Sequence, residues 1–319
     1  LLIAMATFRT PAVALMPDVT LKPLRSKANA IINLMGNAGG IIVLALGSVL
    51  AISKVKNAYM SYTAVYAVVG GIMLAALIIF LLKVKEPAWA HEMQRSSVEL
   101  GLDREEDTQV GTAKKLTKAE FRSLIFILIS VALWYIAYNA LSSAYSRYVL
   151  EIWNISESTG ANMMLVATVV ATASYIPVGI ISSKLGRKKV ILFGVAIMTA
   201  AYLAGFFLTS YSPVIYAVMA VIGIGWASIN VNSYPMVVEM STGADVGRYT
   251  GIYYTFSMAA QIATPILSGV LIDLFGYRIL FPYAVIFSGL ALFTMWQVRH
   301  GDAKPLAKKS AIEYLDSDD

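Results

Sequence analysis

TPAVALMPDVTLKPLR (residues 10–25) and YPMVVEMSTGADVGR (residues 234–248) are two versions of one pattern. Each has a proline in an apolar stretch, then a carboxylate, then an arginine that precedes a helix rich in small and amide residues. The matching residues are Pro11 with Pro235, Asp18 with Glu239, and Arg25 with Arg248. A separation of about 224 residues indicates a weak internal repeat, of the kind that builds two-fold membrane proteins.

The composition identifies a membrane protein. Of 319 residues, 58% are hydrophobic and 14% are charged. The apolar residues gather in blocks of about 20 or more, the length at which a helix crosses a bilayer. The complete spans that we predict cover residues 28–51, 58–82, 122–148, 160–183, 190–209, 213–239, 249–273 and 277–297. Residues 1–16 are expected to be the tail of a further span, because the chain begins in apolar sequence.

The basic residues predict the orientation of the chain. If the loop after residue 16 is cytoplasmic, most lysines and arginines fall on that side. The other side holds Lys54, Lys56, Arg147 and Arg278. This bias predicts a cytoplasmic C-terminus, and we expect the cell (plasma) membrane as the location. We therefore attribute the net charge of +6 to the orientation of the chain in the membrane. Nucleic acid is not an expected partner, because no soluble domain large enough to bind it is predicted.

The predicted spans divide the chain into two helical halves. Residues 1–82 are the end of the first half, 83–121 a cytoplasmic connector, 122–298 a second half of six helices, and 299–319 a cytoplasmic tail. The repeat places Pro11 in the fourth helix of its half. We therefore expect an all-α polytopic fold of 6+6 helices, of which roughly the first three helices are missing from this sequence. The spans 58–82, 190–209 and 277–297 are almost purely apolar, so we expect them to face lipid while the others line a cavity.

GIISSKLGRKK (residues 179–189) ends one predicted span. Its glycines permit close helix approach and a tight turn, and its bases can reach carboxylates at a neighbouring helix end. The stretch resembles the cytoplasmic loop motif of the major facilitator superfamily, with Ser183 where the family has an acid. The resemblance implies a transporter with a cytoplasmic gate in which Glu239 is a partner of the bases; a loop that only fixes topology is the alternative. The gate candidates are Gly179, Lys184, Gly186, Arg187, Lys188, Glu239, Arg25 and Arg248.

The stretch FRTPAVALMPDVTLKPLRSKANAIINLMGNAGG (residues 8–40) carries a narrower resemblance. It is similar to the glycoside-pentoside-hexuronide symporters and the related sucrose-proton symporters. Their Pro-Ala-Leu-Asp pattern is matched by Pro11, Ala14, Leu15 and Asp18. The resemblance implies a sugar or glycoside substrate coupled to a cation, with H⁺ expected and Na⁺ as the other candidate, and no bound cofactor.

Polar stripes at a spacing of four residues predict a binding cavity, because such faces are costly in lipid. Amides bind hydroxyls and aromatic rings stack on a pyranose, which suits a sugar. The alternatives are helix–helix hydrogen bonds, worth under about 2 kcal/mol each, and an interfacial aromatic belt. Asn29 is expected nearer the cytoplasmic end. The cavity candidates are Arg9, Asn33, Asn37, Trp134, Tyr135, Tyr138, Asn139, Trp226, Asn230, Tyr253, Ser257 and Gln261.

The most specific prediction for a single residue concerns Arg9. A guanidinium about two turns inside the membrane costs about 2.5 to 3.5 kcal/mol unless it has a partner. The sequence offers no carboxylate at a comparable depth. Arg9 is therefore expected to pair with an acid on the absent helices or with an anionic substrate such as a hexuronide; a structural arginine that reaches the interface is the alternative.

The function that these patterns favour is secondary active transport of a sugar or glycoside by alternating access, with the bilayer and a small molecule as partners. The protein is expected to be a monomer. The alternatives are an exporter of drugs or organic anions and a receptor that uses a transporter fold. An enzyme is not expected, because the sequence has no cysteine, only two histidines, and no obvious metal site.

Overall fold

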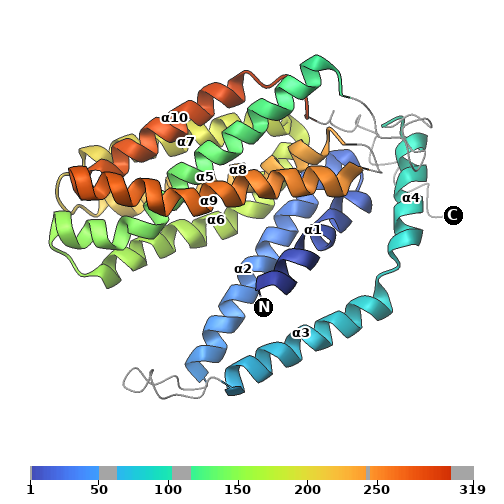
Figure 1. Cartoon of the computed structure of the whole chain (residues 1–319), viewed down its shortest axis with the longest axis horizontal. Coiled ribbons are helices and arrows are strands. Elements are labelled where there is room, and N and C mark those ends of the chain that lie inside the picture. Colours follow the sequence, from blue (N-terminus) through green and yellow to red (C-terminus); the bar gives the residue numbers. More distant parts are fainter. Residues whose placement is uncertain (1, 50–62, 103–115, 242–244, 303–319) are drawn as a thin grey trace.

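The computed structural model describes residues 2–49, 63–102, 116–241 and 245–302 (Figure 1). These residues form helices joined by loops, with no strand among them. The helices are α1 (Leu2–Asp18), η1 (Lys22–Leu24), α2 (Arg25–Val49), α3 (Thr63–Lys83), α4 (Glu86–Glu99), α5 (Lys118–Trp153), α6 (Glu157–Leu185), α7 (Arg187–Phe207), α8 (Val214–Val238), α9 (Val246–Phe275), η4 (Tyr277–Ile279) and α10 (Leu280–Trp296).

The predicted all-α polytopic architecture is confirmed. Within the described part of the chain, seven helices are long and apolar enough to cross a membrane, namely α3 and α5 to α10. The predicted span at residues 28–51 falls on α2, although residues 50 and 51 lie outside the described part, as do residues 58–62 of the next span. Helix α5 begins four residues earlier than predicted, because Thr117 and Glu120 form a capping box at its start.

Helices α5 to α10 form one bundle (Figure 1). Helix α8 packs against both α6 and α7, and α10 packs against both α5 and α7. Small residues allow close approach here: a Cβ on Gly223 of α8 would overlap the backbone of Ala167 in α6. The largest fully buried side chains of this bundle include Trp134, Tyr145 and Phe281. The bundle thereby provides a rigid wall for any site on its surface.

Helices α1 and α2 join the bundle on the side of α6, α8 and α9. Helix α1 packs on α9, and α2 packs on α6 and α8. The later part of α2 leaves the bundle, as Figure 1 shows, and nothing lies near its glycines Gly36, Gly39 and Gly40. The two predicted halves therefore meet along α1 and the first part of α2.

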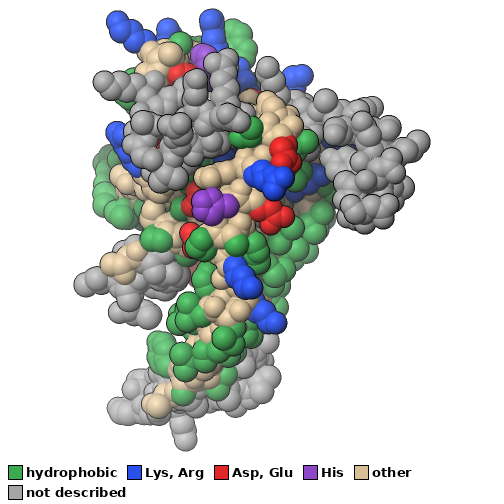
Figure 2. All heavy atoms as spheres, turned by 90° about the vertical axis from the view of Figure 1, so that its right-hand side faces the viewer, with side chains coloured by type: hydrophobic (Ala, Val, Ile, Leu, Met, Phe, Trp, Pro, Cys, Tyr) green, Lys and Arg blue, Asp and Glu red, His purple; other side chains and the backbone are tan. Residues whose placement is uncertain are grey.

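Helix α3 stands apart from the bundle, and α4 follows it within the predicted connector (Figure 1). Figure 2 shows α3 as an arm covered with hydrophobic side chains, and none of its apolar stretch is buried. This exposure fits the prediction that the span 58–82 faces lipid. Helices α7 and α10, the other two predicted lipid-facing spans, also pack tightly within the bundle. Connector residues 103–115 and tail residues 303–319 lie outside the described part.

Candidate functional site

A cavity of about 330 Å³ lies between the two halves. Five helices contribute to it: α1, α2, α5, α8 and α9. Helices α7 and α10 contribute no lining residue, as predicted for these apolar spans. Helix α6, the span 160–183 that was predicted to line the cavity, contributes none either, because it packs against α8 and α2 instead. The lining residues are Arg9, Asn29, Asn33, Tyr135, Trp226, Asn230, Tyr234, Tyr253, Tyr254, Met258 and Gln261.

The amide side chains of the cavity are held by hydrogen bonds, and those of Asn29 cross between the two halves. Asn29 donates to the backbone oxygens of Asn230 and Val231 at 2.9 and 3.0 Å, which ties α2 to α8. The hydroxyl of Tyr135 donates to Oδ1 of Asn230 at 3.4 Å. Asn33 donates to the backbone oxygen of Asn29 at 2.8 Å. These bonds orient the amides and leave further acceptor sites for a ligand.

Aromatic rings form one wall of the cavity. The indole of Trp226 stacks on Tyr138, with ring centroids 3.8 Å apart and planes 6° apart. Tyr135 meets the same indole edge-on at 5.3 Å. Offset and edge-to-face contacts of this kind fix ring orientation. Tyr138 therefore supports Trp226 from behind, although Tyr138 itself does not line the cavity.

Arg9 is the single charged residue among those that line the cavity. Its guanidinium lies 4.9 Å from the centroid of the Tyr254 ring, within the range of a cation–π contact. The Arg9 side chain remains exposed. The residues that line the cavity include no carboxylate.

Five predicted cavity residues lie outside its lining. Trp134 is fully buried in the bundle core, one helical position from Tyr135, because α5 turns it towards the neighbouring helices. Ser257 is also buried, and Asn139 donates to the backbone oxygen of Tyr135. Asn37 instead donates to the Thr172 hydroxyl at 2.6 Å, joining α2 to α6. Tyr138, the fifth, stacks behind Trp226.

Four lining residues were outside the predicted set: Asn29, Tyr234, Tyr254 and Met258. The spacing of four residues was a signal for two of them, because Asn29 continues the stripe of Asn33 and Tyr234 continues that of Trp226 and Asn230. Tyr254 and Met258 directly follow two polar residues of a stripe, and only the packing of α1 against α9 brings them to the cavity.

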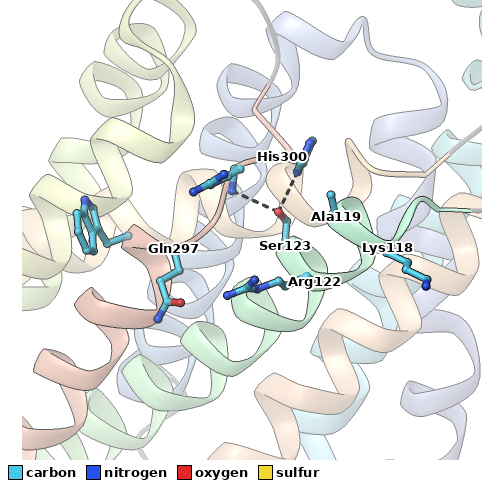
Figure 3. A pocket seen from close by; sticks show the side chains of 8 residues that line it. Lys118, Ala119, Arg122, Ser123, Gln297 and His300 are labelled. Atoms are coloured by element: carbon cyan, nitrogen blue, oxygen red, sulfur yellow. Dashed lines mark hydrogen bonds between the residues drawn. The ribbon is translucent and has the colours of Figure 1, made fainter.

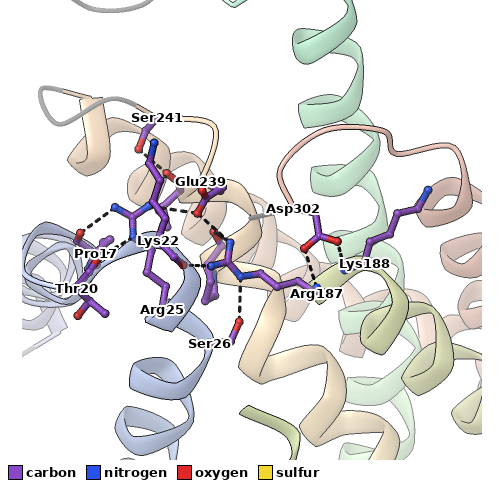
Figure 4. A network of polar contacts seen from close by, with 12 residues as sticks. Pro17, Thr20, Lys22, Arg25, Ser26, Arg187, Lys188, Glu239, Ser241 and Asp302 are labelled. Atoms are coloured by element: carbon purple, nitrogen blue, oxygen red, sulfur yellow. Dashed lines mark hydrogen bonds and ion pairs between the residues drawn. The ribbon is translucent and has the colours of Figure 1, made fainter. Parts of the chain in front are cut away.

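Three of the predicted gate residues, Arg25, Arg187 and Glu239, form a network at the end of the bundle where α6 joins α7 (Figure 4). Arg187 donates to the Glu239 carboxylate at 2.9 Å, so the expected partnership between the loop bases and this acid is present. Arg25 approaches the same carboxylate at 3.6 Å and donates to the backbone oxygen of Pro17 at 2.9 Å. Both guanidiniums are almost wholly buried, at 3% and 5% exposure, so neither charge is screened by water.

This network joins the two halves. Arg187 of α7 also donates to the Ser26 hydroxyl at 3.0 Å and to the backbone oxygen of Lys22, both in the first half. Gly179 packs closely on α2, since a Cβ there would lie 3.0 Å from the Cβ of Ala30. Lys184 and Arg248, the remaining gate candidates on helices α6 and α9, are exposed.

A carboxylate from the start of the predicted tail joins the motif (Figure 4). Asp302 accepts from the backbone N–H groups of Arg187 at 2.7 Å and Lys188 at 3.3 Å. These N–H groups begin α7, where a helix favours negative charge. Gly186 has φ of 94°, and a Cβ there would lie 2.8 Å from the Asp302 carboxylate. The sequence motif lacks an acid at Ser183, and sequence reasoning did not find Asp302.

A polar cavity between two helical halves, together with a buried ion network that joins the halves, is typical of two-halved membrane transporters. Residues 2–144 and 127–313 match the Major Facilitator Superfamily, and the chain belongs to this family. It is therefore a multi-pass membrane transporter for small molecules rather than an enzyme.

The structure is similar to that of the proton:xylose symporter XylE bound to 6-bromo-6-deoxy-D-glucose. The similarity has a TM-score of 0.61 at 15% sequence identity and covers 92% of this chain and 68% of that chain. At this identity the similarity concerns the fold. Comparison with curated proteins finds no match.

Proposed function

We propose that this transporter carries a sugar or glycoside in symport with a proton across the plasma membrane. The observation that supports the proposal is the cavity of about 330 Å³, which combines amides, tyrosines and a supported Trp226. This volume falls in the range of about 300 to 1,000 Å³ typical of small-molecule sites. Amides offer both donors and acceptors to hydroxyls, and the aromatic rings offer a stacking surface. The structurally similar XylE is itself a sugar symporter.

The positive charge of Arg9 favours negatively charged substrates at this site. An acidic sugar, such as a hexuronide, can place its carboxylate against the guanidinium in a bidentate pair. A neutral sugar has no anionic group to pair with Arg9, and no residue lining the cavity competes for the guanidinium with a carboxylate. We therefore expect an acidic sugar to be transported in preference to its neutral counterpart.

Transport would follow alternating access, in which the two halves rock about the central cavity. The network of Arg25, Arg187 and Glu239 joins the halves at one end, which the charge distribution assigns to the cytoplasm. Opening at that end requires these buried ion contacts to separate. The network would thus act as the cytoplasmic gate in a monomer whose C-terminus is cytoplasmic.

Uptake of radiolabelled sugars by proteoliposomes containing the full-length protein tests this proposal. An inward proton gradient should drive accumulation, and a protonophore should abolish it. A sodium gradient alone should have no effect. Absence of uptake for glucuronides, glycosides and free sugars alike would refute the sugar assignment while leaving the family unchanged.

The second candidate is export of organic anions, which Arg9 and its aromatic surroundings would also suit. Cells lacking the protein would then accumulate anionic amphipathic dyes, and proteoliposomes would show no sugar uptake. Competition decides between the candidates, because glucuronate should inhibit dye transport only if both use the same cavity.

A further inference from the structure

A second cavity, of about 460 Å³, lies where the start of α5 meets the end of α10 (Figure 3). It lies apart from the central cavity and shares none of its residues. Basic side chains dominate it, and no carboxylate lines it. The lining residues are Lys118, Ala119, Arg122, Ser123, Trp296, Gln297, Arg299 and His300.

The buried hydroxyl of Ser123 holds the segment that contains Arg299 and His300 against α5. Ser123 is 3% exposed, and its hydroxyl lies 3.0 Å from Nδ1 of His300 and accepts from the backbone N–H of Arg299 at 3.3 Å (Figure 3). The segment after α10 is thereby fixed onto α5. This contact brings Arg299 and His300, which are distant in sequence, to the same cavity as Arg122.

Within the described part of the chain, two carboxylates close in sequence to the lining residues, Glu120 and Asp302, are engaged elsewhere. Glu120 accepts from the backbone N–H of Thr117 in the capping box at the start of α5. Asp302 accepts from the backbone at the start of α7. The positive charge at the cavity is therefore available to an external anion. Three basic side chains of this cavity, Lys118, Arg122 and Arg299, are exposed.

Apolar surface leads away from the cavity along both helices. Exposed residues of α5 recur every four positions at Phe121, Ile125 and Ile129. Exposed residues of α10 recur at Leu290, Phe293 and Trp296. Tryptophan favours the level of the lipid headgroups, so Trp296 marks the membrane boundary beside the cavity. A soluble anion would leave these apolar stripes unused, whereas the acyl chains of a lipid would cover them.

We propose that this cavity binds the phosphate headgroup of an anionic phospholipid, with its acyl chains along α5 and α10. Guanidiniums bind phosphate with charge-assisted hydrogen bonds, and basic cavities between helices at the cytoplasmic surface recruit anionic lipids. The site lies at the same end of the bundle as the gate network, because Asp302, which contacts Arg187, is two residues after the lining residue His300. The proposal is independent of the transported substrate.

Native mass spectrometry of the full-length protein tests the proposal, with phosphatidylglycerol and phosphatidylcholine of identical acyl chains offered together. Phosphatidylglycerol should bind preferentially. Arg122→Gln and Arg299→Gln should each weaken its binding about fivefold, the effect of removing one base near a membrane surface. Arg122→Lys, which keeps the charge, should retain most of the binding.

Lys189→Gln is the matched control. Lys189 is an exposed base at the start of α7, at the same end of the bundle but outside the cavity, and its loss should leave the lipid preference unchanged. An equal loss with Lys189→Gln, or equal binding of the two lipids, would overturn the site. Displacement of bound lipid by millimolar inorganic phosphate would overturn the lipid assignment in favour of a soluble anion.

Discussion

At the residue scale, Arg9 combines exposure, a cavity without carboxylates and a cation–π contact with Tyr254. An arginine buried for structural reasons would be expected to have its charge satisfied by the protein. Here the available partner is an aromatic ring, which attracts a cation without neutralising it. Arg9 can therefore take part in substrate binding without first breaking an ion pair in the cavity lining.

Replacing Arg9 with glutamine should lower kcat/KM for an acidic sugar at least about tenfold, because a hydrogen bond to a charged group contributes about 1.5 to 3 kcal/mol. Arg9→Lys should recover only part of the activity, since lysine lacks the planar fork that binds a carboxylate. Uptake by proteoliposomes measures both. Equal transport by the wild type and Arg9→Gln would show that Arg9 has no role in binding.

Glu239 balances two buried guanidiniums, and this predicts a large effect of its removal. Glu239→Gln leaves Arg187 and Arg25 without that countercharge, at a cost of about 3 to 5 kcal/mol for a broken buried pair. The closed cytoplasmic end should open more often. In a Met258→Cys background, an impermeant maleimide should then label the cavity faster from the cytoplasmic side.

The sequence has no cysteine, so the introduced thiol is the one that reacts. Glu157→Gln is the control, since its pair with Arg147 is about half exposed and water screens such surface pairs. That variant should label at the wild-type rate. Slower labelling of Glu239→Gln would contradict the assignment of this network as a gate.

At the scale of elements, the contact between α6 and α8 depends on glycine. A Cβ at Gly223 would overlap the backbone oxygen and carbon of Ala167, which cannot move as a side chain can. Gly289 of α10 has open space around its Cβ position. Of these two glycines in predicted membrane spans, Gly223 has no room for a side chain and Gly289 has room for one. The sequence around each glycine does not show this difference.

Gly223→Ala should lower the thermal unfolding temperature of the detergent-solubilised protein, because overpacking a helix contact costs about 1 to 3 kcal/mol. Gly289→Ala should leave stability unchanged or raise it slightly, since alanine is favoured over glycine in helices by up to about 1 kcal/mol. Thermal unfolding followed by fluorescence-detected gel filtration compares them. Equal stability of the two variants would mean that α6 and α8 are not closely packed at Gly223.

At the scale of the whole molecule, the bundle has a strongly basic end and a sparsely charged end. Lys118 lies at the start of α5, and Tyr211 lies in the loop between α7 and α8. Helices α5 to α10 alternate in direction through the membrane, so these two positions belong to opposite ends. The positive-inside bias predicts that the Lys118 end faces the cytoplasm.

Single cysteines test this orientation. An impermeant maleimide added to intact cells should label Tyr211→Cys and not Lys118→Cys, because only the former should face outwards. Inverted membrane vesicles should give the reverse result, which also controls for the reactivity of each thiol. Labelling of Lys118→Cys in intact cells would invert the proposed topology and place the ion network outside.

The sequence located the apolar helices α3 and α5 to α10, because a bilayer requires long uninterrupted hydrophobic stretches that are visible in any sequence. It also predicted a span at residues 28–51, but α2, which covers this stretch, is not among the seven membrane-length apolar helices of the described chain. The sequence also predicted that Glu239 is a partner of Arg187, because residues 179–189 resemble a family loop motif and the resemblance implies this pairing. The spacing of four residues found Asn33, Tyr135, Trp226 and Gln261 as cavity residues, because one polar face of a helix repeats at that interval.

The tertiary structure alone decided which of several polar faces meet. Helix rotation placed Trp134 in the core and Tyr135 in the cavity, although the two are adjacent in sequence. Asp302 reached the start of α7 because the chain after α10 folds back across it. Such contacts join segments more than a hundred residues apart, and their formation depends on how neighbouring helices pack, which local periodicity does not encode.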